Sequence, residues 1–134
     1  MSFGKISIKP EFVDERGFIS RVLDDNKVVI KSILHIERKK GETGANHYHK
    51  KDAHYIYIVK GKVKYYEKDM SKRNSKVKSV ILNAGDLMFS PAKVAHRTDF
   101  LEDTMFMAFA TEHRSQEEYE VDTVRLTFVD EKQS

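Results

Sequence analysis

Apolar residues recur at every second position in several short stretches of this chain, and this period restricts the fold more than any other feature. The alternation runs through residues 28–36, 55–59 and 62–66. Stretches rich in Val, Ile, Tyr and Phe with a period of two are typical of β-strands. Residues 104–110 are almost wholly apolar, which predicts a strand covered on both faces.

Turn signals separate these stretches. Glycine stands next to polar residues at 15–17, 41–44, 60–61 and 83–86, and we expect Gly61 and Gly85 to lie in tight turns. A helical period is indicated over the short stretch 115–120. Repeated short strands with intervening turns predict an all-β antiparallel sandwich or barrel.

Composition excludes several classes of protein. The chain has 134 residues and no linker-like segment, which predicts one domain. Cysteine is absent, so disulfides and thiolate chemistry are excluded. Apolar runs fall short of the ~20 residues of a membrane span, and the N-terminal segment lacks an apolar signal core; we therefore expect a cytoplasmic protein with no membrane partner. The 24 basic and 21 acidic residues are interspersed, which does not indicate a nucleic-acid partner.

Three of the six histidines lie within eight residues. His47 and His49 are two positions apart, so their side chains share one face of a strand. The polar residues 50–52 can turn the chain, and His54 then begins a second strand beside the first. With His96, which follows a turn-like Ser-Pro-Ala, up to four imidazoles converge inside a barrel.

Converging imidazoles are typical of a metal site. Neutral imidazole binds zinc, iron, copper and nickel well, and manganese less well. We therefore predict one divalent transition metal, with zinc, iron, manganese and nickel left open, bound by His47, His49, His54 and His96. The alternative interpretation is a group of surface histidines around a turn, which the strand pattern disfavours.

The spacing of these residues resembles the first motif of the cupins. Gly41, His47, His49 and Gly61 occupy the motif positions, and His54 stands where the family has a glutamate. The resemblance implies a site of up to four neutral ligands without a carboxylate, as in the four-histidine minority of cupins.

The second cupin motif is matched in part. Gly85, Pro91 and His96 occupy its positions, whereas Lys93 and Phe100 replace a glycine and an asparagine. The chain is identified as a member of the cupin superfamily, which implies a double-stranded β-helix, or jelly-roll barrel. Residues 1–134 then form a single cupin domain with a core barrel at about 27–110.

Further segments are similar to cupins that act on nucleotide sugars. Residues 12–18 resemble the opening of dTDP-4-dehydrorhamnose 3,5-epimerases and of the C-terminal cupin of capsular-polysaccharide epimerase/reductases. Residues 47–50 and 57–61 are similar to those capsular cupins, and 47–50 also to dTDP-4-keto-6-deoxyglucose 3,4-ketoisomerases. The tail at 110–112 and 121–123 again resembles the capsular domains.

This resemblance implies a sugar-nucleotide isomerase or epimerase in surface polysaccharide biosynthesis. Its substrate would be a nucleotide-linked 4-keto sugar, and its assembly a homodimer with exchanged N-terminal strands. A 4-keto group acidifies the neighbouring C–H bonds, so a base can form an enediolate and a proton can return elsewhere. Two mechanisms remain open: a metal polarises the ketone, or His47 and His49 act as acid and base without metal, as the ketoisomerases imply.

Other residues are candidates for supporting roles. Tyr57 is a candidate acid, and Arg16, Lys50 and Arg97 are candidates for binding a diphosphate. Two functions of other classes stay open as alternatives: a four-histidine iron or manganese dioxygenase, and a cupin that binds a small ligand without turnover. Elemental analysis followed by a screen of nucleotide sugars distinguishes these functions.

Overall fold

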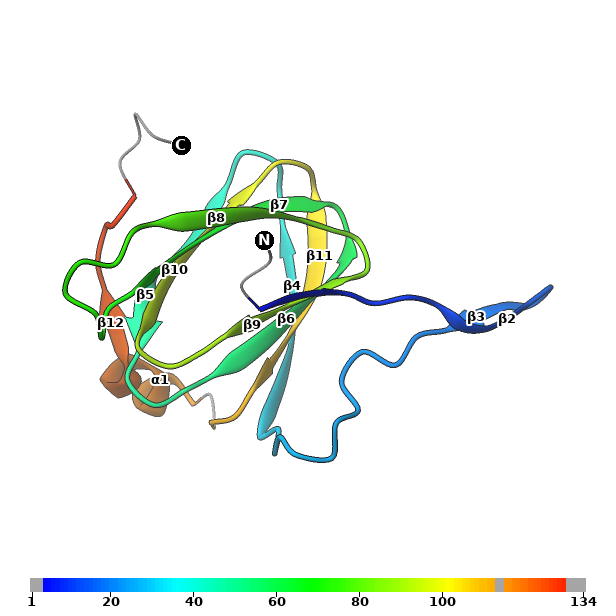
Figure 1. Cartoon of the computed structure of the whole chain (residues 1–134), viewed down its shortest axis with the longest axis horizontal. Helices are drawn as coiled ribbons and strands as arrows, with labels where there is room; N and C mark the ends of the chain where they lie inside the picture. The colour runs from blue at the N-terminus through cyan, green and yellow to red at the C-terminus, as the bar shows by residue number, and fades with distance from the viewer. Residues whose placement is uncertain (1–3, 113–114, 130–134) are drawn as a thin grey trace.

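Two five-stranded antiparallel sheets face each other and curve into a barrel, and a separate two-stranded hairpin lies outside it (Figure 1). The computed structural model describes residues 4–112 and 115–129. This arrangement confirms the predicted all-β, jelly-roll architecture. Among the described residues, none lies in a helix long and apolar enough to cross a bilayer.

The first sheet has the strand order β1-β9-β6-β11-β4. Its strands are, in that order, Lys5–Ser7, Asp86–Ser90, His54–Lys60, Thr104–Ala110 and Ser32–Arg38. The second sheet has the order β12-β5-β10-β7-β8. Its strands are Thr123–Arg125, Thr43–His49, Val94–Phe100, Lys62–Asp69 and Lys78–Asn83.

The side chains that face inward from both sheets form the core. Alternation is clear in β6, where residues 54, 56 and 58 are buried and the residues between them are more exposed. The apolar part of the core is a cluster that includes Ile58, Val63, Leu82, Phe100 and Phe106. The period of two read from the sequence therefore places the apolar residues correctly.

Strand β11 matches the predicted strand at 104–110, but its two faces differ. Phe106 and Ala108 are buried in the core, whereas Met105, Met107 and Phe109 on the outer face are only partly buried. The outer face of the first sheet is thus less covered within one protomer than the apolar sequence predicts.

The predicted turns at Gly61 and Gly85 and the predicted short helix are also present. Gly61 and Gly85 have φ angles of 110° and 92°, and a Cβ atom at position 61 would clash with Thr104 and Asp103. The single described helix, α1, spans Gln116–Asp122, and the Ser115 side chain caps it by accepting a hydrogen bond from Glu118 N. Both turns and the helix were expected from the sequence.

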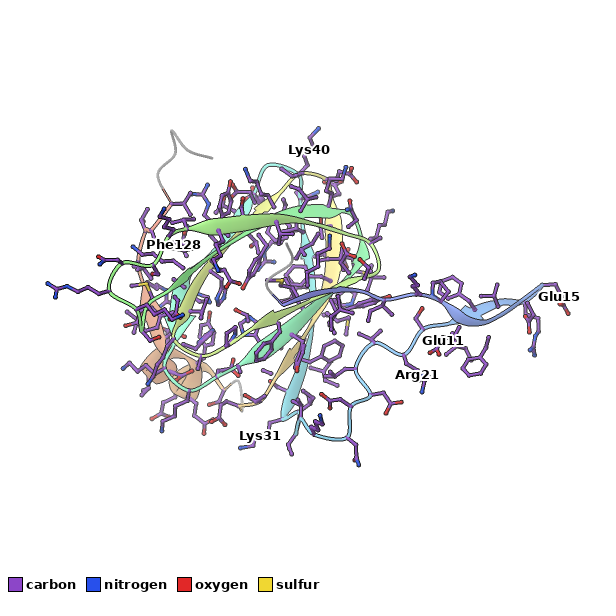
Figure 2. All side chains as sticks on the ribbon, in the orientation of Figure 1. Glu11, Glu15, Arg21, Lys31, Lys40 and Phe128 are labelled. Atoms are coloured by element: carbon purple, nitrogen blue, oxygen red, sulfur yellow. The ribbon has the colours of Figure 1, made fainter. Side chains whose placement is uncertain are left out.

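The hairpin of β2 (Glu11–Asp14) and β3 (Gly17–Ile19) extends away from the barrel, with Glu15 at its tip (Figures 1 and 2). It forms a sheet of its own. Its large apolar side chains are exposed, with Phe12 at 70% and Phe18 at 61% of their full accessibility. Apolar side chains on an arm of this kind indicate an interaction surface.

Candidate active site

Four histidines meet inside one end of the barrel. His47 and His49 come from β5, His54 begins β6, and His96 lies in β10. All four are buried. The ring centroid of His47 lies 4.7 Å from that of His49 and 4.6 Å from that of His96, and the His54 ring lies 5.0 Å from His96. The predicted convergence is therefore present.

The backbone of β5 orients the side chains of His47 and His49. Ala45 and Asn46 have left-handed φ angles of 66° and 62°, and the pairing of β5 with β10 shifts by one residue next to His96. Such a bulge bends a strand and redirects its side chains. Beyond it His47 pairs directly with His96, so both imidazoles point into the barrel.

The hydrogen bonds of His49 define its tautomer. Thr123 Oγ1 lies 3.3 Å from His49 Nδ1 and donates its own proton to the carbonyl oxygen of Tyr119. Asp122 Oδ2 lies 3.4 Å from the same nitrogen. Because the hydroxyl proton is already committed and a carboxylate only accepts, His49 Nδ1 carries the proton. The lone pair of the imidazole is then on Nε2.

His96 is fixed by a second, fully buried chain of contacts. The Tyr65 hydroxyl donates to Ser90 Oγ at 3.0 Å, and Ser90 Oγ lies 3.2 Å from His96 Nδ1. Burial, followed by the neighbouring histidines, lowers the pKa of His96 well below its ordinary value. His96 is therefore neutral, as a metal ligand must be.

His49 lines two cavities. The inner one, of about 160 Å³, is lined by all four histidines together with apolar residues of the core such as Ile36, Phe100 and Phe106. Arg38 of β4 also belongs to this lining. Tyr119 of α1 takes part in both cavities, and its ring centroid lies 5.6 Å from that of His49. His49 and Tyr119 therefore lie where the two cavities adjoin.

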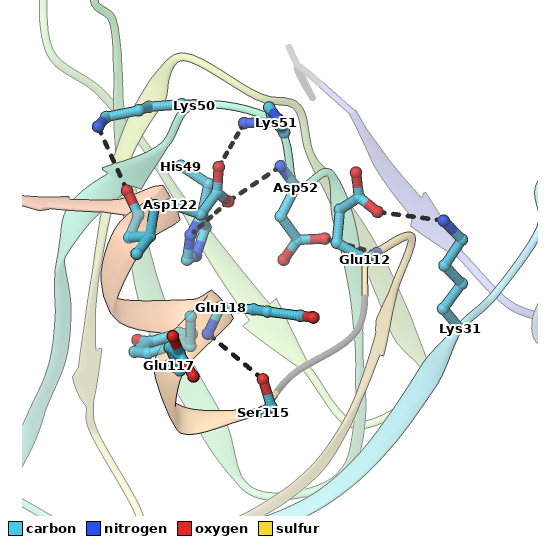
Figure 3. A pocket seen from close by; sticks show the side chains of 12 residues that line it. Lys31, His49, Lys50, Lys51, Asp52, Glu112, Ser115, Glu117, Glu118 and Asp122 are labelled. Atoms are coloured by element: carbon cyan, nitrogen blue, oxygen red, sulfur yellow. Dashed lines mark hydrogen bonds and ion pairs between the residues drawn. The ribbon is translucent and has the colours of Figure 1, made fainter.

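The outer cavity, of about 690 Å³, has a different character (Figure 3). It lies between α1 and the turn that joins β5 to β6. Three lysines and five carboxylates belong to its lining: Lys31, Lys50, Lys51, Asp52, Glu112, Glu117, Glu118 and Asp122.

The structure separates the predicted substrate-binding residues. Lys50 lines the outer cavity and donates to the Val121 carbonyl oxygen at 3.2 Å. Arg97 is next to His96 in β10, points to the opposite face, and pairs with Asp99 at 2.8 Å. Arg16 lies in the hairpin turn, where it pairs with Asp14 at 2.7 Å and is 85% exposed. Of the three, only Lys50 lies beside the histidines.

Tyr57, the predicted acid, also lies on an outer face. It alternates with the buried Ile56 and Ile58 in β6 and pairs with Leu87 and Met107. Tyr119 is the tyrosine whose ring contacts those of His47 and His49.

Sequence reasoning missed the residues that surround His49. Asp122 and Thr123 lie more than 70 positions from it, and Asp52 was treated only as part of a turn. A signal for the first two existed, because residues 121–123 are part of the tail that resembles the capsular cupins. No role was attached to them there.

The donor atoms form two overlapping groups that suit a metal. His47, His49 and His96 each offer one donor atom, and these atoms lie within 4.8 Å of one another; His49, Asp52 and His54 form the other group under the same criterion. Neutral, buried imidazoles are suitable ligands for a divalent transition metal. Of the four predicted ligands, three therefore gather in one group, and His54 groups with His49 and a carboxylate.

A jelly-roll barrel with imidazoles converging in its interior is the architecture that the two motifs predicted. The family model of the cupin domain matches residues 34–112, more than half of the chain. The protein therefore belongs to the cupin domain family, as the two motifs predicted. No curated protein matches the sequence.

Solved structures share this fold at low sequence identity. A 3,4-ketoisomerase from Helicobacter canadensis is 20% identical, with a TM-score of 0.74 over 90% of this chain and 88% of its own. A double mutant of a 3,4-ketoisomerase from Thermoanaerobacterium thermosaccharolyticum, solved with TDP, is 24% identical, with a TM-score of 0.71 over 94% and 90%. A dTDP-6-deoxy-D-glucose-3,5-epimerase from Legionella pneumophila, solved with dTDP-4-keto-L-rhamnose, is 18% identical, with a TM-score of 0.78 over 94% and 73%.

Proposed function

We propose that this cupin isomerises or epimerises a nucleotide-linked 4-keto sugar in surface polysaccharide biosynthesis. The observation that carries the proposal is the pair of the buried His49 and the partly buried Asp122, 3.4 Å apart, with Thr123 on the same imidazole nitrogen. The neighbours solved with TDP and with dTDP-4-keto-L-rhamnose support the substrate class.

The chemistry requires a base, an acid and a partner for the enediolate oxygen. Because Nδ1 of His49 holds the proton, its Nε2 lone pair is the base that removes the proton next to the ketone. Asp122 stabilises the imidazolium that forms. His47, with its ring 4.7 Å from that of His49, returns the proton or donates to the oxygen, and Tyr119 beside both rings is a further donor.

The two cavities suggest how the substrate binds. The inner cavity of about 160 Å³ is smaller than the roughly 300–1,000 Å³ of pockets that enclose drug-sized ligands. It accepts the reacting ring, and the nucleotide stays outside the barrel. Arg38 is the cationic residue of the inner lining and therefore the candidate partner of a phosphate.

A metal-dependent version of this function has its own supporting observation. His47, His49 and His96 form one of the two donor groups and would hold a divalent ion inside the barrel. Such an ion would polarise the ketone. An iron or manganese cupin that reacts with oxygen requires the same ligands. Elemental analysis together with the substrate assay below distinguishes such an oxygenase from the metal-dependent isomerase.

We further propose a homodimer in which the hairpin of β2 and β3 lies on the partner. Phe12 and Phe18 are exposed on an arm that forms its own sheet, and Met107 and Phe109 leave the outer face of the first sheet partly open. Sedimentation at micromolar concentration checks this: the full chain should be dimeric, and deletion of residues 11–19 should give monomers. A monomeric full chain would contradict the dimer and leave the reaction untouched.

The proposed reaction is tested by exchange of solvent deuterium. The purified protein is incubated in heavy water with dTDP- and UDP-linked 4-keto sugars, and NMR follows deuterium at C3 and C5. We expect exchange at one of these positions and none in the His49→Asn variant. If no sugar in the panel exchanges, the oxidative or purely binding cupin is the better account.

A further inference from the structure

We propose that Ala108 selects among 4-keto sugars by limiting the size of the group that the sugar carries at C5. This role presupposes the proposed function and adds to it the residue that distinguishes one substrate from another. Ala108 lies in β11, is 4% exposed and lines the inner cavity. It has the smallest side chain among the first-sheet residues of this lining, which are Ile36, Arg38, His54, Ile56, Phe106 and Ala108 itself.

Ala108 lies across the cavity from most of the histidines. The two histidines of β5 and His96 of β10 belong to the second sheet, whereas Ala108 belongs to the first, and the two sheets face each other. Within the first sheet, Ala108 pairs with Ile56 of β6 and with Leu34 of β4. The cavity therefore has one wall of imidazoles and one apolar wall, in which Ala108 forms a recess between larger side chains.

The shape of a nucleotide-linked 4-keto sugar fits this arrangement. Its C1 atom carries the nucleotide, and the ketone lies on the opposite side of the ring at C4, with C3 and C5 next to it. Since the nucleotide stays outside the barrel, the ketone end of the ring lies deepest in the cavity. The ketone and the hydrogen to be removed face the imidazoles, because buried polar groups need hydrogen-bonding partners. The carbon group on C5 then faces the apolar wall at Ala108.

The rest of the cavity wall leaves little room for a larger group. Phe100 and Phe106 are both buried, and the centroids of their stacked rings lie 5.8 Å apart. On the second sheet, a Cβ atom built on Gly44 would lie 2.8 Å from Thr98 Oγ1 and 3.4 Å from the Phe100 ring. Side chains packed in this way do not move apart without cost. Methyl groups added at position 108 therefore take up the space of the ligand.

The test compares two nucleotide-linked 4-keto sugars, a 6-deoxyhexose with a methyl group on C5 and a pentose with only hydrogen there. Deuterium exchange gives kcat/KM for each sugar with the wild type and with Ala108→Val. Valine adds two methyl groups to the wall, and a misfit of one methylene group in a pocket changes kcat/KM by about 10–200-fold. We expect the hexose-to-pentose ratio of kcat/KM to fall at least about tenfold in the variant. Calorimetry should show that TDP alone binds both proteins equally.

Val63→Ile is the matched control for crowding of the interior. Val63 is buried in the apolar core cluster and is not among the residues that line the inner cavity. An added methyl group there lowers stability through overpacking and leaves the substrate untouched, so the ratio should equal that of the wild type. Ala108→Ser makes a smaller change in volume and should shift the ratio in the same direction. It takes the place of Ala108→Val if thermal melting shows that the valine variant is unfolded.

The possible results separate this role from the reaction itself. A wild-type ratio in a folded variant at position 108 would overturn the role of Ala108 and leave the proposed reaction standing. An equal loss of activity with both sugars, together with weaker binding of TDP, would also overturn it, because general damage to the barrel affects every ligand. If the wild type exchanges neither sugar nor any other in the panel, the proposed function fails, and the role of Ala108 fails with it.

Discussion

The two halves of the barrel interior are built on the same strands and have opposite chemistry. Strand β6 carries Ile58 at one end and His54 at the other, and β10 carries Phe100 and His96 in the same way. The half with Ile58 is apolar, whereas the half with His54 and His96 contains the buried histidines. A few residues along each strand therefore separate the part that stabilises the fold from the candidate active site.

The largest expected effect tests the polar half. His49→Asn should lower the rate of the proposed sugar reaction by about 10²–10⁴-fold, because it removes the proposed general base. The melting temperature should stay close to that of the wild type, since the apolar half is unchanged. Steady-state kinetics and thermal melting of the same preparation check both values. If the variant loses activity because it unfolds, the histidine half also stabilises the fold, and the proposed division between the two halves is wrong.

The matching test of the apolar half is Leu82→Ala. Leu82 is fully buried, and truncation of a buried leucine costs about 2–5 kcal/mol of unfolding free energy. Below the unfolding transition, the activity per folded molecule should equal that of the wild type. Urea denaturation measures the first quantity and deuterium exchange the second. A change in the catalysed exchange rate would mean that the halves are coupled.

Ser90→Ala tests the boundary between the halves. Ser90 joins the buried Tyr65 hydroxyl to His96 Nδ1. Its loss should cost about 1–3 kcal/mol, because Tyr65 is left with a buried donor that has lost its acceptor. Unlike the two preceding variants, this one should change both stability and activity. The same two assays apply, with Ser90→Thr as the variant that retains a hydroxyl.

The smallest effect concerns Glu67, which pairs with His96 across β7 and β10. Burial raises its pKa to about 7, opposed by Lys78 and reinforced by Asp69. Between pH 4.5, the ordinary pKa of this carboxyl group, and about pH 7, Glu67 is protonated in the folded state and ionised in the unfolded chain. The free energy of unfolding therefore falls as the pH rises through this range.

Glu67→Gln removes this dependence. At pH 8 the variant should be about 1–2 kcal/mol more stable than the wild type, a value reduced from the full shift because the side chain is partly exposed. At pH 4 the advantage should disappear. Urea denaturation at the two pH values checks the difference. Equal stability at pH 8 would show that solvent screens the Glu67 charge.

The sequence predicted the strands and the meeting of the histidines, because both follow from a period of two. That rule places His47 and His49 on one face and brings His54 beside them after a turn. Applied strictly, it also places Tyr57 and Arg97 on outer faces, since each adjoins an inward residue.

The residues that complete the site did not follow from any local rule. Asp122 and Thr123 reach His49 only because β12 pairs with β5 at the edge of the second sheet. A contact between residues 74 positions apart depends on sheet order, which periodicity does not specify. Tyr119, which lines both cavities, likewise approaches the histidines from a distant part of the sequence.

The short edge strand β12 has a consequence for how the protein loses activity on heating. Three residue pairs and a helix of seven residues hold Asp122 and Thr123 against His49, while β10 and β11 are paired along their whole length. Short edge segments open at a lower free energy than the interior of a sheet. Amide protons at 123–125 should therefore exchange with solvent well before those of β10, and inactivation should begin at temperatures where the barrel is still intact.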